Sequence, residues 1–230
     1  MNKSLHPSGF TLLELMAVVS LVFVLAMLLV PMLRHSQQQA ASGACMSNLR
    51  NLGSAFQLYA AENNGVLPAM RYRPSSVGAN PNPGQNNWQF EIIPYLDVES
   101  TSFKAISQKY GGQGVFCPGY IREFKQNTSV QALKTGGYGM AKISKDAYDS
   151  RTAMATIANP SSTILAGDSD DYHLAIDSST WASGPDAQGR FSSGDPIRHG
   201  MTANYLFVDG HILRLTQERA EAVLLGRESP

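Results

Sequence analysis

Glu14 is the one ionisable side chain in an apolar stretch that runs from Phe10 to Leu33. Placing a carboxylate inside a bilayer costs roughly 2.5–3.5 kcal/mol, so a lone acid at membrane depth normally has a partner or a function. The chemistry open to it is charge pairing, because a buried charge is tolerated when an opposite charge compensates it. The alternative is a plain membrane anchor in which Glu14 lies at the headgroup boundary.

Acidic residues and a histidine in the C-terminal half offer ligands for a metal ion. Asp168 and Asp170 supply clustered oxygens of the kind that Ca²⁺ takes, without the Gly and distal Glu of an EF-hand loop. Nine residues separate His199 from Asp209, and the imidazole of His199 suits a transition metal better than Ca²⁺. We favour a structural interpretation, in which Asp209 makes a turn while His199 and Asp168 hydrogen-bond nearby loops.

The apolar stretch is long enough to cross a membrane. Residues 15–33 carry no charge, and at about 1.5 Å rise per residue they match the ~30 Å hydrocarbon thickness. A secretory signal would have a shorter apolar core, roughly 7–15 residues, followed by a small-residue cleavage site. Lys3 lies ahead of the stretch and favours a cytoplasmic N-terminus with the rest of the chain across the membrane.

Helical periodicity continues beyond this span. Apolar residues recur at spacings of four, three, four and three, which is one face of a helix: Cys45, Leu49, Leu52, Phe56 and Tyr59. Polar residues fall largely off that face: Asn48, Arg50, Asn51, Gln57 and Glu62. Because residues 63–65, Asn-Asn-Gly, supply a helix stop, we expect one helix over residues 10–63, roughly 80 Å long. Pro31 is expected to kink or locally open it.

The rest of the chain predicts a small mixed domain. Two apolar runs over residues 203–215 are joined by Asp209-Gly210, which predicts a central, helix-covered hairpin with a type I′ turn. Thr216 is expected to cap a C-terminal helix. The other expected elements are a loop over residues 68–87, a short helix over 88–96, a short strand or extended piece over 115–118 that ends at its Pro, a strand over 162–168 and a loop over 177–196.

Composition and missing motifs narrow the function. The chain is 43% hydrophobic and 16% charged, with 18 basic against 18 acidic residues, which describes a neutral globular protein plus one span and implies no nucleic-acid partner. The motifs GxSxG, HExxH, GxxxxGK[ST] and CxxC are missing from the sequence. We therefore expect no enzyme.

The N-terminal sequence GFTLLEL, after a short basic leader, resembles the class III signal of type IV pilins and type II secretion pseudopilins. The resemblance implies that a prepilin peptidase cuts after Gly9 and methylates Phe10. It also implies that Glu14 pairs with the terminal amine of a neighbouring subunit during assembly, and Pro31 matches a proline that is frequent in this family. Major pseudopilins hold Ca²⁺ in a C-terminal loop, so Ca²⁺ is the one cofactor that the resemblance suggests.

The C-terminal pattern H-x9-DG, made by His199, Asp209 and Gly210, resembles the signature of a pilin-like group best known from planctomycetes, verrucomicrobia and lentisphaerae. Further matches lie along the chain, at Cys45-x-x-Asn48-Leu49-Arg50, Tyr59, Asn64-Gly65, Leu67-Pro68, Pro94-Tyr95-Leu96, Cys117-Pro118, Tyr138-Gly139, Pro160-Ser161 and Asp168. Together they cover nearly the whole chain.

These observations predict an α+β, pilin-like fold in which a long N-terminal helix packs on a small antiparallel sheet. The expected divisions are a leader over residues 1–9, a transmembrane and assembly helix over 10–33, its amphipathic continuation over 34–63 and a globular head over 64–230. The expected function is a filament subunit. One alternative is a membrane-anchored binding protein for glycans or polypeptides that never polymerises. Another is an anchored hydrolase with a metal on His199, Asp209 and Asp168.

The resemblance also implies partners and a location. The partners are the prepilin peptidase, other pilin or pseudopilin subunits, an inner-membrane assembly platform and the membrane itself. The precursor would cross the bacterial inner membrane once with its head in the periplasm, and the filament would lie in the periplasm or at the cell surface. Cys45 and Cys117 would then be outside the cytoplasm, where a disulfide persists. Two buried thiols remain the alternative.

Overall fold

A computed structural model describes residues 11–70, 87–96, 116–120, 137–143, 150–169, 171–174 and 194–230, apart from the side chains of residues 31 and 34. Contacts divide the chain into two compact units, Met1–Gln39 and Ala40–Pro230. Gly9, Phe10, Asp170 and most of the two predicted loops lie outside the described residues.

One helix, α1 (Leu12–Glu62), contributes to both units. It continues through residue 31 without a break, so the predicted opening at Pro31 does not interrupt it. It ends where the sequence predicts, because Asn64 and Gly65 take positive φ angles of 55° and 75°. The Gly65 N–H then donates a 2.7 Å hydrogen bond to the Ala60 carbonyl and closes the last turn.

The second unit contains a five-stranded sheet in the order β3-β1-β2-β4-β5. Its strands are β1 (Tyr138–Ala141), β2 (Ile164–Asp168), β3 (His173–Leu174), β4 (Thr202–Phe207) and β5 (Ile212–Thr216). The pairs β1–β2, β2–β4 and β4–β5 are antiparallel, but β1 and β3 are parallel. The sheet is therefore mixed rather than wholly antiparallel. The chain reverses between β2 and β3, so β3 runs against β2 and alongside β1.

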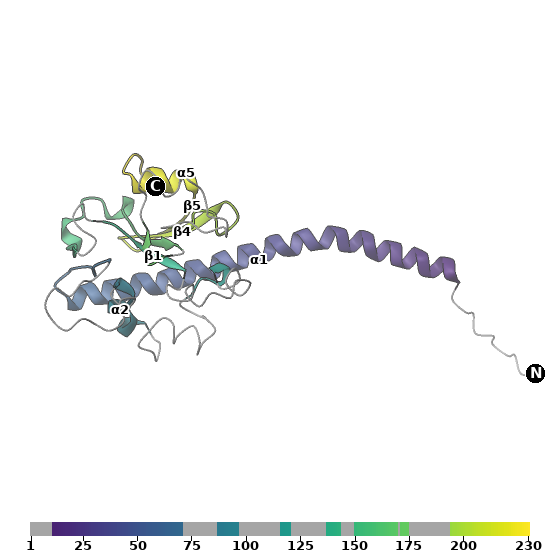
Figure 1. Ribbon diagram of the computed structural model, residues 1–230, viewed down its shortest axis with the longest axis horizontal. Helices are drawn as coiled ribbons and strands as arrows, with labels where there is room; N and C mark the ends of the chain where they lie inside the picture. Colours follow the sequence, from purple (N-terminus) through teal and green to yellow (C-terminus); the bar gives the residue numbers. More distant parts are fainter. Residues whose placement is uncertain are drawn as a thin grey trace, which may run out of the picture. The chain divides into compact units, whose positions relative to one another are not determined.

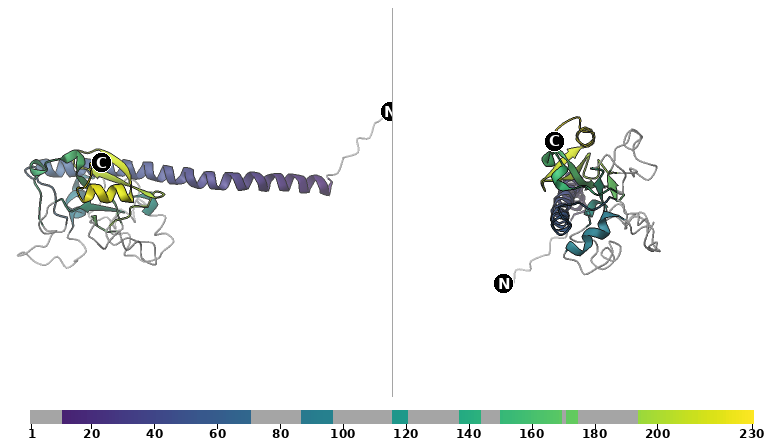
Figure 2. Two further views of the ribbon diagram at one scale, coloured as in Figure 1. Left: turned by 90° about the horizontal axis from the view of Figure 1, so that it is seen from above. Right: turned by 90° about the vertical axis from the view of Figure 1, so that its left-hand side faces the viewer.

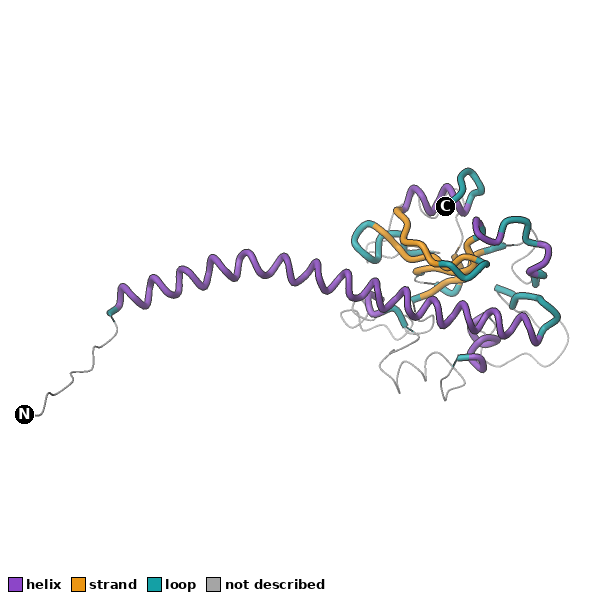
Figure 3. The backbone as a smooth tube through the Cα atoms, turned by 180° about the vertical axis from the view of Figure 1, so that it is seen from behind, coloured by secondary structure: helices purple, strands orange, loops and turns teal. Residues whose placement is uncertain are grey.

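Helices cover both faces of this sheet (Figures 1 and 2). Successive side chains of a strand point to opposite faces, and β4 is buried on both. Leu206 joins the core that α1 lines, whereas Tyr205 and Phe207 pack with Ala220 and Val223 of α5 (Gln217–Leu224). The domain thus has three layers, with the sheet between the C-terminal part of α1 and α5. This is the predicted α+β arrangement (Figure 3).

The apolar face predicted for residues 45–59 is buried along its whole length. Phe56 stacks on Trp88 at 5.2 Å between ring centroids. Trp88 begins α2 (Trp88–Ile92), which a single-turn helix, η2 (Ile93–Tyr95), extends as predicted. Asn48, predicted to fall off the buried face, is only 6% exposed. Its side-chain NH₂ donates to the Phe116 carbonyl at 2.7 Å, which satisfies the buried amide.

The remaining elements correct several details. Residues 116 and 117 form no strand, and a helical turn over residues 118–120 begins at Pro118, where the predicted strand or extended piece was expected to end. The strand predicted over residues 162–168 begins at Ile164, after two single-turn helices, η4 (Met154–Thr156) and η5 (Pro160–Ser162). Thr216 caps α5 as predicted, with its side chain accepting from the Arg219 N–H.

The predicted hairpin is present as β4 and β5, but β5 lies at the sheet edge rather than at its centre. Its turn is not type I′. Gly210 has a φ of 93°, whereas Asp209 does not take a positive φ. The Phe207 carbonyl accepts from the Gly210 N–H at 2.9 Å, and the Phe207 N–H donates to the His211 carbonyl at 2.9 Å. This is a three-residue loop with one left-handed glycine, so only one residue needs the unusual conformation.

Candidate functional site

The apolar part of α1 has no cover from the described chain. The large apolar side chains described between Leu12 and Leu33 are 47% to 77% exposed. Over this stretch the helix is long and apolar enough to cross a membrane. Monomeric soluble proteins rarely expose so large an apolar surface, so this segment requires lipid or another protein against it.

Glu14 lies in the first turn of α1, where Thr11 binds its carboxylate. The Thr11 backbone N–H and hydroxyl donate to Glu14 Oε2 at 2.9 and 2.8 Å. In return, the Glu14 N–H donates to the Thr11 hydroxyl at 3.3 Å. This reciprocal pair is a capping box, and the spacing Thr-x-x-Glu at a helix start is its sequence signature. Thr11 is therefore a residue that sequence reasoning missed although its signal was present.

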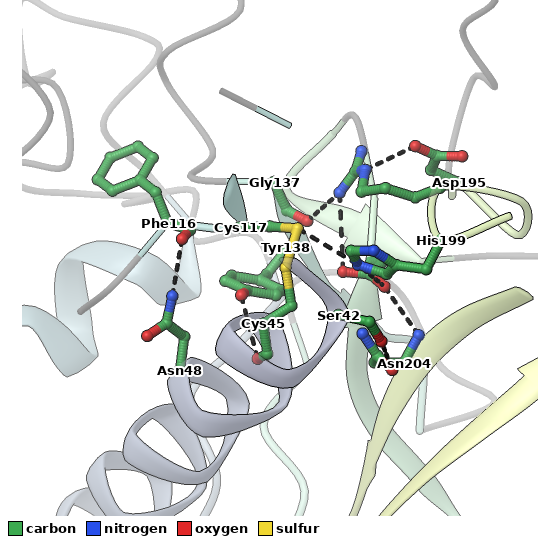
Figure 4. The surroundings of a disulfide bond; sticks show 12 residues. Ser42, Cys45, Asn48, Phe116, Cys117, Gly137, Tyr138, Asp195, His199 and Asn204 are labelled. Carbon is green, nitrogen blue, oxygen red and sulfur yellow. Dashed lines mark hydrogen bonds and ion pairs between the residues drawn. A yellow bond between two sulfur atoms is a disulfide. The ribbon is translucent and has the colours of Figure 1, made fainter. Parts of the chain in front are cut away.

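A second site lies in the head, where four segments meet at a disulfide (Figure 4). Cys45 of α1 is bonded to Cys117, with 4.8 Å between their Cα atoms. His199 Nε2 lies 3.4 Å from Cys117 Sγ and 3.3 Å from Asp168 Oδ2. All four residues are buried. We call Cys45, Cys117, Asp168 and His199 the disulfide cluster.

Secondary structure holds each member of the disulfide cluster in place. Asp168 ends β2, and its Oδ2 accepts the backbone N–H of Asn204 on the neighbouring strand β4 at 2.7 Å. His199 lies in the turn before β4, where its N–H donates to the Thr202 carbonyl at 2.8 Å. Positive φ angles at Gly200 (71°) and Met201 (69°) make that turn tight. The sheet and its turn thus aim both side chains at the cysteines.

Arg198 supplies the positive charge beside the disulfide cluster. Its Nε lies 2.6 Å from Asp195 Oδ2 and its Nη1 lies 3.8 Å from Asp168 Oδ1. Nη1 also donates to the Gly137 carbonyl at 2.5 Å, and the guanidinium lies 5.0 Å above the Tyr120 ring. A buried carboxylate is tolerated when a hydrogen-bonded cation accompanies it. Asp195 and Tyr120 carry no signal in the sequence that links them to Arg198.

Tyr138 of β1 ties that strand to α1 beside the disulfide cluster by a neutral hydrogen bond. Its hydroxyl donates to the Cys45 carbonyl at 3.2 Å. Burial raises the pKa of the Tyr138 phenol well above its usual value, and the negative charge of Asp168 raises it further. The phenol therefore keeps its proton and remains a donor.

The structure separates the two halves of the H-x9-DG pattern. His199 is buried at the disulfide cluster, whereas Asp209 is exposed in the β4–β5 turn. Asp209 Oδ1 accepts from the His211 N–H at 3.1 Å and lies 2.5 Å from His211 Nδ1. Partial burial opposes the effect, but these contacts lower the pKa of the Asp209 carboxyl. The metal site predicted for the hydrolase alternative is therefore wrong in its third ligand, because only Asp168 and His199 come together.

This chain aligns with a protein of stated role over most of that protein's length. The chain is 41% identical over 138 residues to the type II secretion system core protein G of Pectobacterium carotovorum subsp. carotovorum, an alignment that covers 59% of this chain and 72% of that protein. This chain belongs to the pseudopilin family. No family model matches it. No solved structure matches it either.

Membership in the pseudopilins gives the exposed part of α1 a context. A pseudopilin is a structural protein, and the family together with the apolar N-terminal helix fits a membrane-anchored, single-pass protein. The long helix packed on a small sheet is the arrangement expected of a pilin-like subunit.

Proposed function

We propose that this pseudopilin is a filament subunit that a prepilin peptidase trims between Gly9 and Phe10 and methylates at Phe10. The mature subunit leaves the membrane and stacks against other subunits through the apolar part of α1. The filament is a type II secretion pseudopilus or a related type IV pilus-like fibre. The observation that carries the proposal is the exposed apolar helix with one acid in its first turn, in a chain 41% identical to a core pseudopilin.

The environment of Glu14 supports a role in assembly. Thr11 gives two hydrogen bonds to Oε2 but brings no positive charge. In an apolar filament core the carboxylate would remain uncompensated, and leaving a buried ion unpaired costs roughly 3–5 kcal/mol. The amine that cleavage creates on Phe10 of a neighbouring subunit would supply the missing positive charge. The pairing requirement favours one stagger between subunits.

The proposed location follows from the same features. Lys3 ahead of the span favours an N-terminus in the cytoplasm, so the head lies in the periplasm. The disulfide in the head suits that oxidising compartment. The partners are the peptidase, an inner-membrane assembly platform and further subunits. The H-x9-DG pattern suggests that this pseudopilin belongs to the pilin-like group that carries it.

Substitution of Glu14 tests the assembly role. Glu14→Leu removes both the charge and the Thr11 hydrogen bonds, whereas Glu14→Gln removes the charge and keeps an acceptor for Thr11. We expect both variants to be cleaved and methylated, as seen by intact mass, and to lose assembly, as seen by cross-linking of adjacent subunits. If Glu14→Gln assembles as well as the unmodified protein, the helix cap and not the charge is what matters.

Glu218→Leu is the matched control. It replaces an exposed acid in the first turn of α5 and should leave assembly unchanged. A native protein that retains Met1 and stays monomeric would overturn the proposal and favour the anchored binding protein instead.

A further inference from the structure

The disulfide cluster has the residue composition of a metal site, which the disulfide keeps from binding a metal ion. One ligand atom from each of Cys45, Cys117, Asp168 and His199 lies within 4.8 Å of the other three, and all four residues are buried. In the oxidised chain the sulfurs are bonded to each other and do not act as thiolate ligands. Reduction releases two thiols beside a histidine and a carboxylate that the sheet already holds in position.

The distances fit zinc. With bonds of about 2.3 Å to sulfur and about 2.0–2.1 Å to nitrogen and oxygen, the edges of a tetrahedral zinc site are about 3.5 Å from S to N and about 3.3 Å from N to O. The observed separations are 3.4 Å from Cys117 Sγ to His199 Nε2 and 3.3 Å from His199 Nε2 to Asp168 Oδ2. Two edges of the tetrahedron are thus present before any ion arrives.

We propose that the dithiol form of the disulfide cluster binds one Zn²⁺ through Cys45, Cys117, His199 and Asp168. A dithiol or phosphine reductant gives two electrons to the disulfide and breaks the S–S bond. A dithiol reagent gives its two protons to the cysteines and becomes a disulfide itself. A phosphine becomes its oxide, and water supplies the oxygen of the oxide and the two protons of the thiols. Zn²⁺ then forms two Zn–S bonds, and the two thiols release their protons to solvent.

Charge and coordination chemistry favour this exchange. Replacing a neutral disulfide by two thiolates and a divalent cation leaves the net charge of the buried site unchanged, so Arg198 and Asp195 keep their pairing. Asp168 Oδ2, the oxygen that faces His199 Nε2, accepts the Asn204 N–H and keeps a further lone pair for a metal ion, whereas Oδ1 lies 3.8 Å from Arg198 Nη1. Two thiolates and an imidazole select Zn²⁺ rather than Ca²⁺, which takes oxygen ligands.

The surrounding structure supplies the outer support that metal ligands need. The Asn204 N–H fixes the Asp168 carboxylate at 2.7 Å, and Arg198 Nη1 lies 3.8 Å from its other oxygen. Such partners hold ligands in orientation, and their loss typically lowers metal affinity about 10–100-fold. The bound ion would replace the disulfide as the link between α1 and Cys117. This property does not depend on filament assembly.

The test uses the full chain in detergent, reduced with a phosphine and freed of metal. We expect one Zn²⁺ per chain by competition with a chromogenic chelator. Co²⁺ in place of Zn²⁺ should give a thiolate-to-cobalt charge-transfer band and tetrahedral d–d bands. Reoxidation of the cysteines should abolish both signals. His199→Gln should weaken Zn²⁺ binding at least about 10-fold, since losing a ligand costs no less than losing its outer support.

Asp209→Asn is the matched control, because it changes the other half of the H-x9-DG pattern at an exposed turn and should bind Zn²⁺ like the unmodified protein. Circular dichroism of oxidised and of reduced His199→Gln shows whether that variant folds with and without the disulfide. The proposal is overturned if the reduced chain takes up no stoichiometric Zn²⁺, including the case in which it unfolds and Zn²⁺ does not refold it. Equal affinity in folded His199→Gln and Asp209→Asn also overturns it.

Discussion

Removing the disulfide should cost the head a large part of its stability. Cys45 and Cys117 are 72 residues apart in sequence and both fully buried, so Cys45→Ala and Cys117→Ala leave compatible apolar side chains and remove the cross-link. Opening a loop of that length returns chain entropy to the unfolded state worth about 4 kcal/mol. For a domain of this size the midpoint of thermal unfolding should fall by about 8–16 °C.

The measurement is thermal unfolding of the full chain in detergent, followed by near-ultraviolet circular dichroism. A metal chelator is present throughout, so that no bound ion substitutes for the bridge. Either single substitution already opens the loop, so each single variant, with its remaining thiol kept reduced and unmodified, should lose as much as the double variant. The unmodified chain after reduction should match them.

A fall in stability below about 1 kcal/mol for the double variant would refute the loop-closure reasoning. So would a double variant that loses twice what either single variant loses, because additive costs would mean that each cysteine contributes through packing. Agreement among the single, double and reduced forms is the signature of a cross-link.

Three other changes probe the sheet, the interior of α1 and its C-terminal end. A Cβ on Gly167 would lie 2.5 Å from Tyr205 Cδ1, so Gly167→Ala should lower the free energy of unfolding by about 1–3 kcal/mol. Gly43→Ala, with nothing within 4 Å of the new atom, should raise it by about 0.5–1 kcal/mol. Equal effects in urea titrations would contradict the packing argument. Burial and the charge of Glu91 raise the pKa of Tyr59 to about 12 from 10.0. The stabilisation that Tyr59 gives is therefore complete below pH 10 and lost as the pH rises to about 12. Because the pKa values of Tyr95, Tyr138 and Tyr205 are also raised, Tyr59→Phe should make the fall of stability across that range shallower without removing it. An unchanged slope would place the titration elsewhere.

Local patterns predicted the elements well. The apolar face from Cys45 to Tyr59 is buried as predicted. Apolar residues spaced three and four apart share one face of an α-helix, and that face packs on the core. Gly65 ended α1 and Thr216 began α5, since each satisfies backbone groups within its own turn. The hairpin followed from two apolar runs around Asp209-Gly210.

Long-range contacts were beyond sequence reasoning. Asn48 appeared polar and solvent-facing, but its partner at Phe116 lies 68 residues away. The disulfide cluster draws its members from four segments whose meeting depends on the sheet order, which no local spacing encodes. The turn type was wrong for a different reason, because Asp-Gly is compatible with both a two-residue and a three-residue loop and only strand register decides between them.

The bridge between Cys45 and Cys117 sets how the head responds to tension. A force applied between the two chain ends passes from α1 through the disulfide, so the polypeptide between the two cysteines carries no load and does not extend. At about 3.3–3.6 Å per extended residue, roughly 240 Å of contour length is withheld from extension. A single subunit stretched by a force probe should therefore unravel to a shorter end-to-end length than its reduced counterpart, by that amount.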